Sequence, residues 1–218
     1  MKKKILVVAA HPDDEVLGCG ATIKKHSIQK DEIYLVILSS GVSPKTRLGK
    51  NQKNERLKHL FNSSKILGIN KKNIYINNFP DNEFDTISNL DIVKKIEKYL
   101  NIIKPDIIYT HWFKDLNIDH KITANALLTA ARPLPKSNVE LILGFEILSN
   151  TEWEIDNSAR FSGNIYTDIG KTLDYKLKAM KAYKNELRES PHPRSLNNIK
   201  NKASVDGSSC GSQYAERF

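Results

Sequence analysis

The chain has 218 residues, of which 39% are hydrophobic and 27% charged, and this composition excludes a disordered or membrane-embedded protein. No apolar stretch in the sequence is long enough to span a bilayer. The formal charge of +9 comes from lysines spread through nearly every segment, so a lysine-rich surface explains it, with an anionic substrate such as a nucleotide-sugar as the alternative.

Strand and helix patterns alternate along the chain. Short apolar runs predict strands at 5–10, 33–38, 74–76, 106–110 and 139–147, with a sixth at 163–168. Amphipathic spacing predicts helices at 16–30, 55–67, 90–103, 121–131 and 169–187, with Ile28 and Leu90 among the positions expected in the core. A polar tail follows, and its Ser/Gly-rich part, 201–212, is expected to be loosely ordered.

Strands that are regularly separated by helices imply a mostly parallel sheet with right-handed crossovers. We therefore predict an α/β fold, a Rossmann-like three-layer sandwich that forms a single domain over residues 1–218. In such folds ligands bind at the carboxyl ends of the strands, so the site is expected at that edge of the sheet.

His11-Pro12-Asp13-Asp14-Glu15 forms the polar turn between the first strand and the first helix. A histidine and acids at the end of a buried strand are costly unless a cation joins them. The His-x-x-Asp spacing can place an imidazole nitrogen and a carboxylate oxygen on one ion, and the other aspartate can then face an open coordination position, as a catalytic zinc site requires. Capping of the helix by Asp13 or Asp14 is the alternative, but it does not explain His11.

Asp115-Leu116-Asn117-Ile118-Asp119-His120 follows the fourth strand, at the same edge of the predicted sheet. His120 can supply a third ligand beside His11 and Asp14, and Asp119 can hold an imidazole in the required tautomer. The alternative is that Asp119 is an ordinary N-cap and His120 an exposed helix residue.

Other features are interpreted as peripheral. His26 and His59 lie on predicted helix faces away from this edge and are interpreted as surface residues. Residues 42–54 are polar and basic, and are interpreted as a mobile loop over the site that carries Arg47. Cys19 and Cys210 provide no disulfide framework, which favours reduced thiols and a cytoplasmic location.

Two other classes of protein lack support in the sequence. A dinucleotide-binding oxidoreductase would need G-x-G-x-x-G in the first turn, but Gly18-Cys19-Gly20 lies inside the first predicted helix. A nucleic-acid-binding module would need clustered basic and aromatic residues, which this sequence does not contain.

These motifs resemble the PIG-L/LmbE-like family of zinc-dependent N-acetylglucosamine-type deacetylases. The resemblance rests first on Ala10 to Glu15 and on the distant pair Asp119-His120. It covers almost the whole chain, because further segments are similar to bacterial members: 81–85, 115–120, 145–153, 191–195 and 214–218.

The resemblance implies that His11, Asp14 and His120 bind one zinc ion per chain and that Asp13 is the general base. The implied reaction removes an N-acetyl group from an amino sugar or its conjugate, such as a nucleotide-sugar or a glycan precursor, and releases acetate. The implied partner is thus a small N-acetylated sugar and not a nucleic acid. The identity of the sugar and the oligomeric state stay open, a homo-oligomer included. A metal-dependent amidase or phosphoesterase acting on a non-sugar substrate is the alternative.

Asn117 departs from the family pattern, because several members carry a histidine here that stabilises the oxyanion or protonates the leaving amine. An asparagine amide can donate a hydrogen bond but cannot deliver a proton. The leading candidate for the missing catalytic role is His192, followed by His111 and Asp115, and packing of the His192 segment against the domain is the alternative.

Four residues are expected to contact the substrate, because they lie in loops or at strand ends that face the crevice: Arg47, Asp115, Glu146 and Arg194. Surface ion pairing is the alternative for the two arginines and Glu146.

Overall fold

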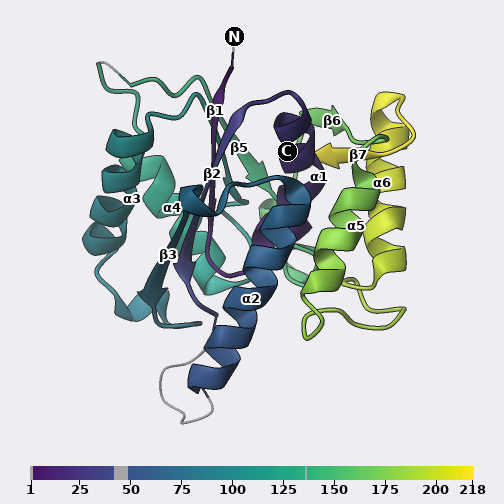
Figure 1. Cartoon of the computed structure of the whole chain (residues 1–218), viewed down its shortest axis with the longest axis horizontal. Helices are drawn as coiled ribbons and strands as arrows, with labels where there is room; N and C mark the ends of the chain where they lie inside the picture. The colour runs from purple at the N-terminus through teal and green to yellow at the C-terminus, as the bar shows by residue number, and fades with distance from the viewer. Residues whose placement is uncertain (1, 42–48, 136) are drawn as a thin grey trace.

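A parallel five-stranded sheet lies at the centre of the protein, in the order β3-β2-β1-β4-β5 (Figure 1). The computed structural model describes residues 2–41, 49–135 and 137–218. The strands of this sheet are β1 Lys4–Ala9, β2 Glu32–Ser39, β3 Ile74–Phe79, β4 Ile107–His111 and β5 Leu141–Phe145. Every neighbouring pair is parallel, so the predicted sheet is confirmed.

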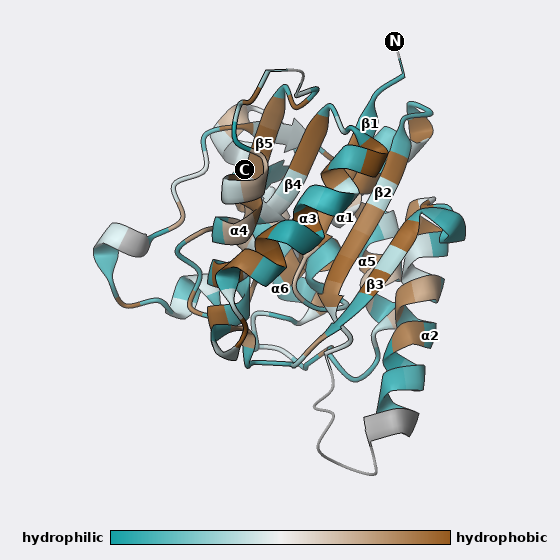
Figure 2. Cartoon of the chain, turned by 90° about the vertical axis from the view of Figure 1, so that its left-hand side faces the viewer, coloured by the Kyte–Doolittle hydropathy of each residue, from teal (hydrophilic) through white to brown (hydrophobic). Residues whose placement is uncertain are grey.

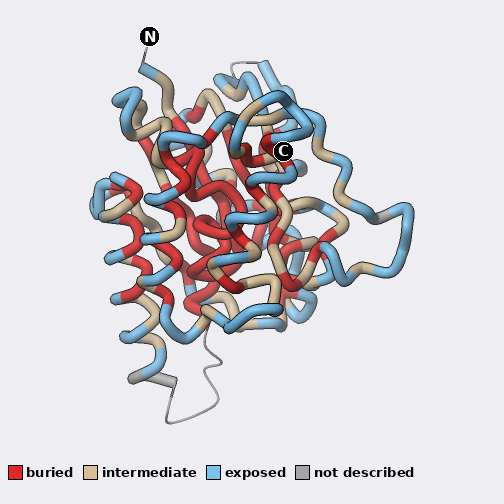
Figure 3. Tube along the Cα trace, turned by 90° about the vertical axis from the view of Figure 1, so that its right-hand side faces the viewer, coloured by how far each residue is buried: buried red, intermediate tan, exposed pale blue. Residues whose placement is uncertain are grey.

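Helices cover both faces of the sheet and complete three layers (Figure 1). One face is covered by α1 Asp14–Ile28, α2 Gly49–Leu67, α5 Leu173–Ala182 and α6 Leu196–Cys210, and the other by α3 Asn89–Ile103 and α4 Ile118–Ala130. Because alternate strand residues point to opposite faces, Ile5 and Val7 pack with α1 and α2, whereas Leu6 and Val8 pack with α3 and α4. Strands covered on both sides are continuously apolar, as Figure 2 shows, and they form the buried centre in Figure 3. The described residues also form four short 3-10 helices: η1 Lys71–Asn73, η2 Phe84–Thr86, η3 Thr151–Trp153 and η4 Asn157–Ala159.

The connections after β1 and β4 leave the sheet toward opposite faces. β1 and β4 are neighbours, but α1 packs on one face and α4 on the other. Ligands of open α/β sheets bind at such a switch point. The two polar motifs singled out in the sequence lie on these two connections.

The C-terminal region differs from the prediction. β6 (Tyr166–Asp168) does not join the central sheet but pairs antiparallel with β7 (Ala215–Arg217). α5 ends at Ala182, and the expected loose tail instead forms α6. α6 buries Ile199, Ala203 and Gly207, and a Cβ at Gly207 would lie 2.7 Å from backbone atoms of residues 212–214. Because the other buried position is Asp206 and the stripe holds one large apolar residue, the hydrophobic pattern on which the helix prediction depends is weak.

Several individual positions also differ. Ile28 and Leu90 are exposed, because each lies in a terminal turn of its helix. His59 is buried, with its ring edge-on to Tyr183 at 6.3 Å between centroids, and His26 is half-buried between the side chains of Asp31 and Tyr109. In the described part of the chain, no helix has the length and apolar character needed to cross a bilayer.

Candidate metal centre

The turn after β1 holds Asp13 in an unusual conformation. Asp13 is the N-cap of α1, yet its φ is 107° and its ψ is −29°, and its side chain makes no capping hydrogen bond. A left-handed conformation costs a non-glycine residue about 1–3 kcal/mol and is found mainly where surrounding contacts enforce it. Capping therefore does not explain Asp13, and its carboxylate is free for another role.

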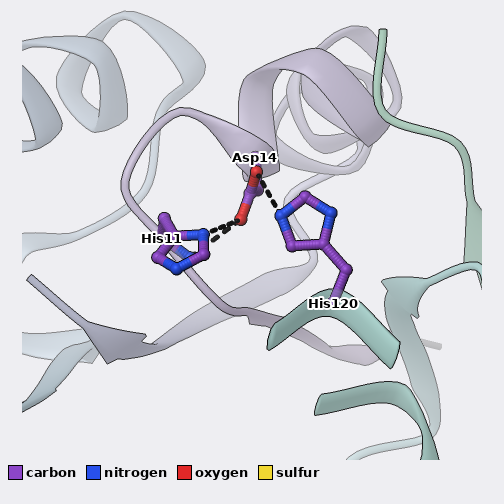
Figure 4. A group of neighbouring side chains, drawn as sticks. All are labelled: His11, Asp14 and His120. Atoms are coloured by element: carbon purple, nitrogen blue, oxygen red, sulfur yellow. Dashed lines mark hydrogen bonds and ion pairs between the residues drawn. The ribbon is translucent and has the colours of Figure 1, made fainter. Parts of the chain in front are cut away.

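His11, Asp14 and His120 converge at the carboxyl ends of β1 and β4 (Figure 4). Asp14 lies between the two imidazoles, with Oδ2 3.5 Å from His11 Nδ1 and Oδ1 3.4 Å from His120 Nε2. All three residues are buried, and one ligand atom from each lies within 4.8 Å of the others. The structure thus brings together the three residues expected to bind a metal.

Each of the two imidazoles has a second carboxylate next to the ring nitrogen that does not face Asp14. Asp119 Oδ2 lies 2.9 Å from His11 Nε2, and Asp115 Oδ1 lies 3.1 Å from His120 Nδ1. Metal-binding histidines commonly present one nitrogen to the ion and donate from the other to such a carboxylate. Two neutral imidazoles and one carboxylate, oriented in this way, are a donor set that suits a divalent transition metal.

This placement corrects the expectation for Asp115. Its side chain is fully buried, and besides His120 it accepts hydrogen bonds from Thr151 Oγ1 and from the backbone N–H of Asn117. Asp115 therefore positions His120 and is not available to contact a substrate.

A second group, formed by His11, Asp81 and Asp119, could also hold a cation. Asp119 already accepts backbone hydrogen bonds from Asn82 and Phe84, at 2.7 and 3.0 Å, in addition to its contact with His11. With most of its acceptor sites used in this way, Asp119 is a poorer metal ligand than Asp14, and we take the group around Asp14 as the candidate centre.

The charges of the centre favour a bound cation. Burial opposes the charged form of Asp14, but His120 and His11 outweigh it and hold the pKa of Asp14 well below its usual range. Burial likewise lowers the pKa of both imidazoles, but their carboxylate neighbours raise the pKa of His11 to about 10 and that of His120 to about 9. The surrounding acids thus draw positive charge to the imidazoles, and a metal would displace the protons held there.

His111 lies next to the candidate centre and packs against one of its histidines. His111 is fully buried, accepts a hydrogen bond from the Ala10 N–H at Nε2, and stacks on His120 with ring centroids 4.0 Å apart. Burial and the neighbouring His120 hold its pKa well below the usual value. A buried, neutral imidazole whose Nε2 accepts a hydrogen bond is unsuited to the missing acid role.

Asn117, and not Asp119, is the N-cap of α4. Its Oδ1 accepts hydrogen bonds from the N–H groups of Asp119 and His120, at 2.9 and 3.3 Å. Its amide nitrogen donates to Asn82 Oδ1 at 3.3 Å. Asn117 therefore fixes the start of the helix that carries Asp119 and His120, which rules out the alternative in which Asp119 is merely a cap.

Two arginines flank the carboxylate of Asp13. Arg194 Nη1 lies 3.0 Å from Oδ2 and Arg56 Nη2 3.9 Å from Oδ1, and Glu186 pairs with both arginines. Burial raises the pKa of Asp13 to about 7, although the positive charge of Arg194 acts in the opposite direction. Arg56 could not be identified from the sequence, because nothing in the helical pattern of α2 distinguishes this half-buried residue from the exposed basic residues of the same helix.

The remaining predicted residues have different positions. His192 belongs to the same loop as Arg194, where its Nδ1 accepts the Arg194 N–H at 3.1 Å and its ring lies edge-on to Trp153. Glu146 forms ion pairs with Lys202 and Arg217 beside α6, which favours the ion-pairing alternative over a contact with substrate. Arg47 lies outside the described residues.

Comparisons with known proteins agree with the sequence motifs. The PIG-L family model, described as GlcNAc-PI de-N-acetylase, matches residues 6–131. A probable N-acetylglucosaminyl-phosphatidylinositol de-N-acetylase of Dictyostelium discoideum is 36% identical over 112 residues, which are 50% of this chain and only 41% of that protein. A probable N-acetyl-alpha-D-glucosaminyl L-malate deacetylase 2 of Bacillus cereus is 26% identical over 93% of this chain and 91% of its own length.

Solved structures show the same fold. The N,N'-diacetylchitobiose deacetylase of Pyrococcus horikoshii superposes with a TM-score of 0.80 at 24% identity, covering 99% of this chain and 82% of the other. The family match covers more than half of the chain and includes His11, Asp13, Asp14 and His120. The chain therefore belongs to the PIG-L family.

Proposed function

We propose that this protein is a zinc-dependent N-deacetylase that removes the acetyl group from an amino sugar or an amino-sugar conjugate and releases acetate. The observation that carries the proposal is the buried His11–Asp14–His120 group beside Asp13, a carboxylate that caps no helix. The family match and the deacetylase names of the relatives support the same reaction.

His11, Asp14 and His120 would hold the zinc ion, with Asp119 and Asp115 orienting the two imidazoles. When bound, zinc supplies Lewis acidity that lowers the pKa of water and polarises a carbonyl oxygen. The protein contributes a buried position for the ion and a fixed orientation of each ligand.

Asp13 would act as general base and then as general acid. It accepts a proton from the water that attacks the acetamide carbonyl, and returns a proton to the nitrogen as the C–N bond breaks. The products are acetate and a free amine. Arg194, at 3.0 Å, favours the deprotonated form of Asp13 from which the cycle begins.

Acetate release from a panel of N-acetylated sugars and nucleotide-sugars tests this proposal, with zinc-depleted and zinc-reloaded protein compared on each substrate. We expect zinc-dependent release from at least one amino sugar. Non-sugar N-acetyl amides and phosphate esters form the second arm of the panel. Turnover confined to that arm would replace the proposal by a metal-dependent amidase or phosphoesterase.

The pH dependence of the reaction should report the ionisation of Asp13. A base works only when deprotonated, and burial raises the pKa of Asp13 to about 7, so kcat/KM should rise with pH through about 7 and then level. Arg194→Gln removes the nearer of the two cations that lower this pKa, so the rise should move to higher pH. A profile that Arg194→Gln leaves unchanged would contradict the electrostatic role of Arg194.

Replacing His192 tests whether it has a catalytic role. We expect His192→Ala to lower turnover roughly tenfold or more, because the imidazole lies on the loop that places Arg194 against Asp13. Zinc content and thermal stability should stay near the wild-type values. A loss of activity that is matched by a loss of stability would indicate a packing role instead.

A further inference from the structure

The backbone of Asp13 needs an explanation that its own side chain does not provide. An aspartate at an N-cap normally adopts an extended backbone and accepts a hydrogen bond from the first turn of its helix. Asp13 does neither, with φ at 107° and no capping bond. Something outside the residue must keep it from relaxing onto the end of α1.

Glu15 provides this contact from within the first turn of α1. Its Oε2 accepts the backbone N–H of Asp13 at 3.0 Å, while the backbone oxygen of Asp13 accepts the N–H groups of Val16 and Leu17, both at 3.0 Å. The N–H belongs to the peptide before the Asp13 Cα, and the oxygen to the peptide after it. Because hydrogen bonds fix both of the peptides that flank the Asp13 Cα, they restrict both φ and ψ of Asp13.

Tyr183 in turn holds Glu15. Its hydroxyl donates to Glu15 Oε1 at 2.6 Å across 168 residues of sequence, and both side chains are fully buried. Tyr183 directly follows α5, with His59 edge-on to its ring. The carboxylate of Glu15 is thereby fixed between a rigid core residue and the strained peptide.

The arrangement resembles half of a capping box, shifted by one residue. In the complete motif, an acidic side chain at the third helical residue binds the N-cap N–H while the N-cap side chain binds back to the helix, whereas Glu15 is the second residue of α1. Here Glu15 makes the first bond, but the Asp13 side chain lies between Arg194 and Arg56 instead. The bond that is missing here is the one from the Asp13 carboxylate, which is the group that the proposed reaction would use.

We propose that Glu15 and Tyr183 are positioning residues, which hold the backbone of Asp13 so that its carboxylate stays off the helix terminus and remains available as the base. This inference rests on the proposed function for the role of Asp13, but its structural part concerns only the Asp13 peptide. The two can therefore be tested separately.

The first test is Tyr183→Phe, which removes one hydroxyl and keeps the ring. We expect kcat to fall roughly tenfold, with KM and zinc content unchanged, because only the orientation of the Asp13 carboxylate is affected. Tyr109→Phe is the matched control: it also removes a buried hydroxyl, which bonds to His26 Nε2 at 3.0 Å, away from the site. It should leave turnover unchanged. Equal losses in both variants, in proportion to their stability, would overturn the inference.

The second test measures hydrogen exchange of the Asp13 amide by NMR and needs no substrate. Exchange should be at least roughly tenfold faster in Tyr183→Phe and Glu15→Leu than in wild type, since the amide loses a fixed acceptor. Glu15→Gln retains an acceptor oxygen and should restore slow exchange and most of the turnover. An unchanged exchange rate in Tyr183→Phe would overturn the inference whatever the activity. Absence of deacetylation by the wild type, with the expected exchange pattern, would instead overturn the proposed function alone.

Discussion

Asp13→Asn is expected to lower turnover by roughly 10²–10⁴-fold, the contribution typical of a positioned general base. Asparagine has nearly the same shape as aspartate but cannot accept a proton from water at neutral pH. Asp13 contacts Arg194 and Arg56, and is not part of the His11–Asp14–His120 group. Zinc content should therefore remain at the wild-type level while the rate falls.

Asp14→Asn should have a different effect, because Asp14 lies between the two imidazoles. We expect weakened zinc binding, with activity that partly recovers at high zinc concentration. Asp31→Asn serves as a control, since Asp31 binds His26 and the Lys3 N–H at the opposite edge of the sheet. If Asp13→Asn lost zinc and Asp14→Asn kept it, the roles of the two carboxylates would be reversed.

Removing a histidine of the centre should abolish both zinc binding and activity. His120→Ala deletes one of three ligands, and it also removes one of the imidazoles that face Asp14 and the imidazole that faces Asp115. We expect zinc, measured by mass spectrometry, to fall far below one ion per chain. His11→Ala should behave alike, because Asp14 and Asp119 both face His11.

Thermal unfolding with and without added zinc separates loss of metal from loss of fold. Zinc should raise the Tm of the wild type by binding to the native state, and should leave the Tm of both variants unchanged. His26→Ala, which removes a histidine outside the centre, should keep the zinc-dependent shift. Full zinc occupancy in the protein that lacks both His11 and His120 would show that the ion binds elsewhere.

The sequence by itself determined the class of fold and the position of the candidate centre. Buried parallel strands must be apolar along their length, so β1, β2 and β4 are visible as short hydrophobic runs. The carboxyl ends of parallel strands meet at one edge, so the polar motifs that follow β1 and β4 could be placed together before their contacts were known. His11, Asp14 and His120 do converge there.

Only the tertiary structure decided what surrounds these residues. Asp115 and Glu146 look alike in sequence, since each follows a strand of the same sheet, but one binds His120 and the other pairs with Lys202. Arg56 and Tyr183 reach the Asp13–Glu15 turn from α2 and from the end of α5, and no local pattern marks such long-range contacts. Hydrophobic periodicity reports which face of an element is buried, but not which distant side chain packs against it. The partners of a catalytic group therefore depend on how the helices dock on the sheet.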